Sequence, residues 1–121
     1  MSYTKFGEYF RILRIKNREV LADVKDFLNA SSAFISAVEC GKKQIPEDWF
    51  MKIVNHYDLN EKEQQELMEA IELSKVSIKI SLTTASPIQR SVAIQFQRSF
   101  NDLDDDKMQL IQEILERNTK N

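Results

Sequence analysis

A chain of 121 residues with a formal net charge of −2 has room for one domain or two small ones. Only two glycines and two prolines occur, which favours helices over turn-rich β structure. The apolar runs are too short to span a bilayer and no signal-peptide pattern opens the chain, so we expect a cytoplasmic protein without membrane association. A single cysteine, Cys40, excludes an internal disulfide bond.

The sequence carries no catalytic motif, because it has no Gly-rich phosphate loop, no metal-ligand cluster and no nucleophile–base pair. We therefore predict that the protein is not an enzyme and uses no cofactor or metal. Charge is distributed unevenly: residues 1–60 contain nine Lys and Arg against eight Asp and Glu, whereas residues 61–121 contain eight against eleven. The N-terminal half is thus slightly positive and the C-terminal half negative, which favours the N-terminal half as the one that faces nucleic acid.

Residues 4–18 are predicted to form the first helix, since Phe6, Phe10 and Leu13 recur at helical spacing. Cations crowd its C-terminal half: Arg11, Arg14, Lys16 and Arg18. Cations suit the negative end of the helix dipole, and beside a DNA-binding element they can also lie against phosphates.

The next stretch predicts two short helices joined by a tight turn, one over about residues 20–28 and one over about 32–40. Asn29 tolerates a left-handed backbone and can end the first of them. Ser31 can cap the second by accepting a hydrogen bond from a free amide, and Gly41 after it is available for positive φ.

The helix expected over residues 32–40, the third in the chain, carries a spaced pattern together with the residues beside it: Ser31, Ile35, Ser36, Val38, Glu39 and Gly41, followed by Lys42, Lys43 and Pro46. This pattern resembles the lambda-repressor-like (Cro/repressor, XRE-type) helix-turn-helix family over about residues 5–70. The resemblance implies a five-helix domain whose third helix enters the major groove of DNA. It also implies that Arg14 pairs with Glu39 and ties the first helix to the third, a structural role.

The resemblance implies that the residues facing DNA lie on this third helix and in the loop after it. With Arg18 from the end of the first helix, the predicted DNA contacts are Arg18, Ser31, Ser32, Ala33, Ser36, Ala37, Lys42 and Lys43. Serine can bond to several base edges, whereas alanine can only touch a thymine methyl group. The chain departs from the family at two positions, with Leu21 where a contacting Gln is often found and Lys25 where a small residue is usual. Specificity is therefore expected from Lys42 or Lys43, from DNA shape, or from a partner.

Two further helices complete the predicted domain. The fourth is expected to begin at Pro46 and to turn Trp49 and Ile53 inward. His56 stands alone in the sequence and is expected at the surface. The fifth is announced by a capping box at Asn60, and the side chains expected inward are Leu67, Met68, Ile71 and Leu73.

Residues 75–121 differ in pattern from the family domain. Val76, Ile78, Ile80 and Leu82 alternate with polar residues, which predicts one short β-strand. It either pairs with the same strand of a second subunit across a two-fold axis or is an extended linker. A helical hairpin should follow, the first helix starting at Ser86–Pro87 and the second running over about residues 105–117. An acidic run at residues 102–106 fits a helix cap better than a calcium loop.

The predicted fold class is therefore all-α: a helix-turn-helix domain over residues 1–74, then one short strand and a helical hairpin over residues 75–121. The predicted dimerisation residues are Val76, Ile78, Ile80, Leu82, Phe96 and Phe100. The expected function is sequence-specific binding of double-stranded operator DNA by a homodimeric phage or bacterial regulator, most simply a repressor. The alternative is a protein-interaction module that keeps the helix-turn-helix fold with little sequence readout. A further form of it is an antitoxin-like partner, which binds another protein through its C-terminal region and its own promoter through its N-terminal half.

Overall fold

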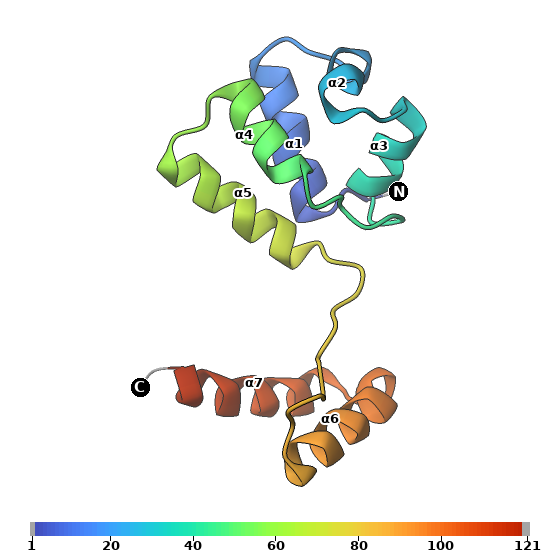
Figure 1. Cartoon of the computed structure of the whole chain (residues 1–121), viewed down its shortest axis with the longest axis vertical. Helices are drawn as coiled ribbons and strands as arrows, with labels where there is room; N and C mark the ends of the chain where they lie inside the picture. The colour runs from blue at the N-terminus through green and yellow to red at the C-terminus, as the bar shows by residue number, and fades with distance from the viewer. Residues whose placement is uncertain (1, 120–121) are drawn as a thin grey trace. The chain divides into compact units, whose positions relative to one another are not determined.

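The computed structural model describes residues 2–119 and is helical (Figure 1). The first five helices are α1 (Lys5–Lys16), α2 (Leu21–Leu28), α3 (Ser32–Glu39), α4 (Trp49–Tyr57) and α5 (Glu61–Leu73). An extended segment leads to α6 (Pro87–Ser99), the short 3₁₀ turn η1 (Phe100–Asp102) and α7 (Asp105–Thr119). Two compact units result, the first ending at Ile78 and the second beginning at Lys79. Within the described residues, no helix is both long and apolar enough to cross a membrane.

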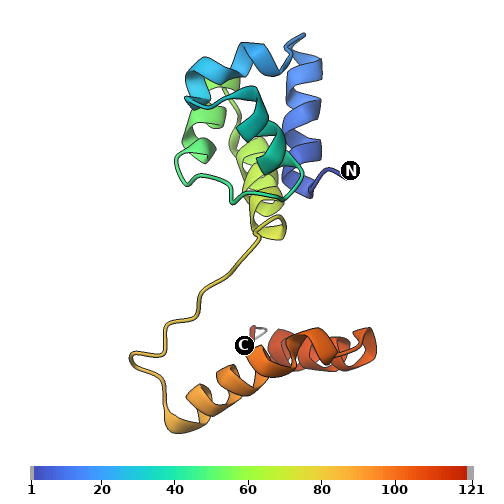
Figure 2. The ribbon, with the colours of Figure 1, turned by 90° about the vertical axis from the view of Figure 1, so that its right-hand side faces the viewer.

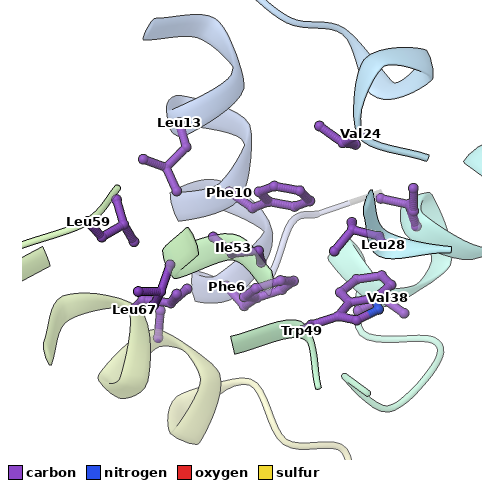
Figure 3. Packing of buried hydrophobic residues seen from close by; sticks show 13 residues of the cluster. Phe6, Phe10, Leu13, Val24, Leu28, Val38, Trp49, Ile53, Leu59 and Leu67 are labelled. Atoms are coloured by element: carbon purple, nitrogen blue, oxygen red, sulfur yellow. The ribbon is translucent and has the colours of Figure 1, made fainter. Parts of the chain in front are cut away.

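One apolar core holds the first unit together, and all five of its helices contribute (Figure 3). Phe6 and Phe10 of α1 are completely buried and stack on each other with ring centroids 5.7 Å apart. Trp49 of α4 is 1% exposed and its ring lies 6.3 Å from that of Phe6. Leu67 of α5 closes the core from the other side. The lone tryptophan is therefore a packing residue.

Local hydrogen bonds explain where several helices begin. The side chains of Ser31, Asn60 and Ser86 each accept a hydrogen bond from the backbone amide three residues later. At Asn60 the bond is reciprocated, because Glu63 Oε1 accepts from the Asn60 amide at 3.0 Å. Asn29 ends α2 in the left-handed conformation, with φ of 53°. The predicted caps at these positions are confirmed.

Two sequence-based expectations about the fourth and fifth helices were wrong. Residues 46–48 form a separate turn, closed by a hydrogen bond from the Trp49 amide to the Pro46 carbonyl, and α4 begins only at Trp49. In α5 the buried face consists of Leu67 and Ala70, while Leu73 is 75% exposed and Met68 is also exposed. Both exposed residues fit an apolar periodicity, but the face that packs is decided by the neighbouring helices.

The predicted β-strand was also wrong, because within residues 2–119 the structure contains no strand. Residues 76–82 are extended, and the Val76 amide donates to the Gln44 side chain at 3.1 Å rather than to another strand. Ile78 is 76% exposed. An alternating pattern makes a strand only where a second extended segment supplies hydrogen-bond partners, and the described chain offers none.

The second unit is built from α6 and α7 and has no buried side chain among its described residues. The helices leave η1 in different directions and form an open V (Figures 1 and 2). Phe96 and Phe100 make an edge-to-face contact at 5.6 Å near the turn. Asp104 caps α7 by accepting from the Lys107 amide at 2.9 Å, which confirms the capping role expected for this acidic run.

Candidate nucleic-acid interface

The candidate interface is built on α2, the turn after it, and α3. Asn29 and Ala30 donate their amides to the carbonyls of Asp26 and Lys25, which closes α2 within two residues. The Ser31 hydroxyl then accepts from the Phe34 amide at 3.1 Å and opens α3. The left-handed Asn29, one intervening residue and the Ser31 cap make a tight connection between the two helices.

One face of α3 is packed and the other is open. Ile35 and Val38 are buried in the core, and Glu39 is 1% exposed. Among the predicted contact residues, Ala33 and the capping Ser31 are exposed, while Ser32, Ser36 and Ala37 are half-buried. The outer face is therefore accessible and small, so another molecule can approach the α3 backbone closely.

The end of α3 fixes where its two lysines emerge. Gly41 has φ of 77°, its amide donates to Val38, and the amide of Lys42 donates to the Ala37 carbonyl at 2.8 Å. These two bonds form a Schellman motif, which turns the chain sharply away from the helix axis. Lys42 and Lys43 follow at once, and both are exposed.

The C-terminal end of α3 is held from the other side by α1. Arg14 Nη1 lies 2.7 Å from Glu39 Oε2 and Nη2 lies 3.3 Å from Oε1, so the pair is bidentate and buried. The Thr4 amide and hydroxyl both donate to the Glu39 carbonyl, at 2.9 and 3.0 Å. Gly7 packs so closely that a Cβ there would lie 2.2 Å from that carbonyl oxygen. These contacts set the orientation of α3.

Two effects at this buried pair shift the pKa of Glu39 in opposite directions. Burial raises the pKa of Glu39, and the Arg14 guanidinium counteracts that rise through its hydrogen bond and charge. The cost of burying both charges offsets much of their attraction, so the intact pair fixes the geometry of α1 and α3 more than it adds net stability. Removing one partner would nevertheless be costly, because it would leave the other charge buried and unpaired.

The other predicted residues lie outside α3. Arg18 is exposed in the turn between α1 and α2, with φ of 56°. Lys25, the departure from the family pattern, is exposed on α2. The predicted dimerisation residues are mostly exposed: Val76, Ile78, Ile80 and Phe100, with Leu82 and Phe96 half-buried. The structure thus brings together the predicted contacts on α3 and in the loop after it, while Arg18 belongs to the turn before α2.

Sequence reasoning missed a polar cluster beside this region. Glu19 accepts from the Tyr57 hydroxyl at 2.6 Å, and His56 Nε2 lies 2.8 Å from its other oxygen. Burial, followed by the hydrogen bond to Glu19, raises the pKa of Tyr57. No local signal announces this cluster, because Glu19 is far from both partners in sequence.

The first unit also has a hollow outside the candidate interface. It is open, lies between α1 and α5 and contains Tyr9, Ile12 and Glu66, none of which is a predicted contact. Within residues 2–119, no cluster of His, Cys, Asp or Glu side chains is arranged to hold a metal ion. Comparisons with protein-family models, curated proteins and solved structures find no match to this chain.

Proposed function

We propose that this protein is a cytoplasmic, sequence-specific DNA-binding regulator of the lambda-repressor-like helix-turn-helix type, acting as a homodimeric repressor. Helix α3 enters the major groove, and Lys42 and Lys43 contact the phosphates or base edges beside it. The second unit supplies the dimer through α6 and α7.

The observation that carries this proposal is the geometry of α3. It is a short capped helix with one face, Ile35 and Val38, locked in the core, and an outer face of small residues. Two exposed lysines follow at a turn fixed by the backbone of α3. An accessible helix of this kind, flanked by cations, matches what a major groove accepts.

The proposal is tested by selecting bound duplexes from a pool of genomic fragments at several salt concentrations. A regulator should enrich a pseudo-palindrome with half-sites about one helical turn, roughly 34 Å, apart. Its affinity should fall as salt rises, because bound cations displace counterions from the duplex. Enrichment of no sequence at any salt concentration would refute the proposal.

Substitution of the two lysines sharpens the test. Lys42→Ala and Lys43→Ala should each weaken binding and reduce the slope of log affinity against log salt by about 0.9, the value for one lost phosphate contact. Lys62→Ala, on the exposed surface of α5, removes the same charge as a control.

A second candidate is a protein-interaction module or antitoxin-like partner. The exposed apolar side chains of α6 and α7 favour it, since Ile88, Leu110 and Ile114 are all more than 60% exposed. Under this alternative the second unit is covered by a different protein. A pure interaction module should enrich no duplex, whereas an antitoxin-like partner should still bind its own promoter through the first unit.

A further inference from the structure

The turn between α1 and α2 is anchored to the C-terminal end of α4 by a single carboxylate. Both oxygens of Glu19 are engaged: Oε1 accepts from Tyr57 Oη at 2.6 Å and Oε2 lies 2.8 Å from His56 Nε2. The Glu19 side chain is 19% exposed and that of His56 is 33% exposed. A mostly covered carboxylate with two partners holds one orientation far better than a free surface glutamate.

The residue before Glu19 has an unusual backbone. Arg18 has φ of 56°, a left-handed conformation that is costly because its Cβ comes close to the following carbonyl oxygen. The Arg18 amide donates to Ile15 at 3.1 Å, and the Glu19 amide donates to the Arg14 carbonyl at 2.8 Å. With the Glu19 side chain fixed as well, the backbone of the turn at Arg18 is held in one conformation.

The same cluster supports α2. The ring of His56 stacks on Phe27 of α2 with centroids 3.9 Å apart and planes only 9° from parallel. Tyr57 contacts Phe27 edge to face at 6.2 Å. At the start of α2, Asp23 accepts from the Val20 amide at 2.7 Å. The first turn of α2 therefore follows directly from a segment that Glu19 holds in place.

We propose that Glu19 is a positioning residue for DNA binding: it holds Arg18, in the turn that leads into α2, toward the phosphates that flank the groove occupied by α3. This inference rests on the proposed function, because it assigns Glu19 a part in the same interface. Glu19 itself does not touch DNA, since both of its oxygens are occupied within the protein.

The direction in which DNA affinity changes when Glu19 is removed distinguishes a positioning role from a purely electrostatic one. Removing a carboxylate from a protein that binds a polyanion should strengthen binding, because one repulsive charge disappears. If Glu19 positions Arg18, its removal should instead weaken binding. Glu19→Ala is expected to lower affinity about tenfold and to reduce the salt slope by about 0.9, as for one lost phosphate contact.

The matched control is Glu69→Ala on the exposed surface of α5, which removes the same charge and should leave affinity unchanged or slightly raised. Tyr57→Phe removes only one hydrogen bond to Glu19 and keeps the ring in place. It should reproduce part of the loss in affinity and salt slope even if Glu19→Ala compromises folding, which a thermal melt reveals.

A double-variant cycle identifies Arg18 as the residue through which Glu19 acts. Once Arg18→Ala has removed the side chain, adding Glu19→Ala should cost little further affinity. Additive losses would overturn the proposal, and so would unchanged binding by Glu19→Ala and Tyr57→Phe. Failure of the wild-type protein to bind any duplex is a different result, which refutes the proposed function and this inference with it.

Discussion

The contact between Gly7 and Glu39 shows how one residue sets the distance between two helices. Gly7 lies inside α1, where glycine normally costs about 1 kcal/mol relative to alanine. It is nevertheless required, because the Glu39 carbonyl and its neighbouring backbone atoms occupy the space of a Cβ. Backbone atoms cannot rotate out of the way as a flexible side chain can.

Gly7→Ala is therefore expected to destabilise the protein by about 2 kcal/mol, since overpacking outweighs the gain in helix propensity. The urea midpoint, followed by circular dichroism, measures this. Glu8→Ala, at the exposed neighbouring position, should stay within about 0.5 kcal/mol of wild type. A Gly7→Ala protein as stable as wild type would show that α1 and α3 are not in close contact.

The buried pair of Arg14 and Glu39 gives a prediction about pH. Arg14→Met is expected to cost about 3–5 kcal/mol near neutral pH, because it leaves Glu39 charged and unpaired in the core. Without the guanidinium, the pKa of Glu39 in the folded state rises further above its ordinary value of 4.5. Between pH 4.5 and that raised pKa the folded state holds a proton that the unfolded state has lost, so stability falls as pH rises through this range.

Denaturation of Arg14→Met at several pH values between 4.5 and 7 measures this slope. It should be steeper than in wild type, where Arg14 limits the rise in the pKa of Glu39. Adding Glu39→Gln removes the titrating group and should abolish the extra slope. Equal pH dependence in Arg14→Met and wild type would contradict this account.

At the scale of the elements, short helices depend on their ends. α3 has eight residues, too few to be stable alone, so its cap and its packed face decide whether it forms. The same holds for α2, which the left-handed Asn29 terminates. Both ends of the connection between them are therefore specified by two residues, Asn29 and Ser31.

Ser31→Ala removes the hydroxyl that accepts from the Phe34 amide and should cost about 1 kcal/mol. In a unit of this size, the melting temperature should fall by about 5 °C. Ser32→Ala, one position later, removes a hydroxyl that does not cap the helix and should leave the melting temperature within a degree or two. Equal changes in melting temperature from the two substitutions would show that Ser31 does not stabilise α3 as its cap.

At the scale of the whole molecule, the two units differ in how much apolar surface they bury. The buried apolar side chains among the described residues all lie in the first unit. The second unit leaves Ile114 and Leu115 61% exposed and Phe100 53% exposed. Two helices that form an open V are too small to make a core alone, which is why we propose that a second copy covers them.

Ile114→Glu and Phe100→Glu should convert a dimer into a monomer, as measured by sedimentation equilibrium, because each places a charge on the surface that is buried in the dimer. Gln109→Glu adds the same charge at an exposed polar position of α7 and should leave the dimer intact. A wild-type protein that is monomeric at all concentrations would contradict the dimer, as would equal disruption by all three substitutions.

The sequence by itself determined the features whose causes are local. Each predicted cap at Ser31, Asn60 and Ser86 involves an amide three residues away, so a short window of sequence contains both partners. Helical periodicity likewise identified Phe6 and Phe10 as core residues, although it could not decide which face of α5 packs. The pairing of Arg14 with Glu39 was expected only through resemblance to a family.

Only the tertiary structure decided the contacts between residues far apart in the chain. Glu19 meets His56 and Tyr57 across 37 and 38 positions, and no spacing rule links them. The alternating residues from Val76 to Leu82 looked like a strand, yet hydrogen-bond partners, which no single segment contains, determine whether a strand forms. Local sequence fixes how a segment begins and ends, whereas its neighbours in space fix what it pairs with.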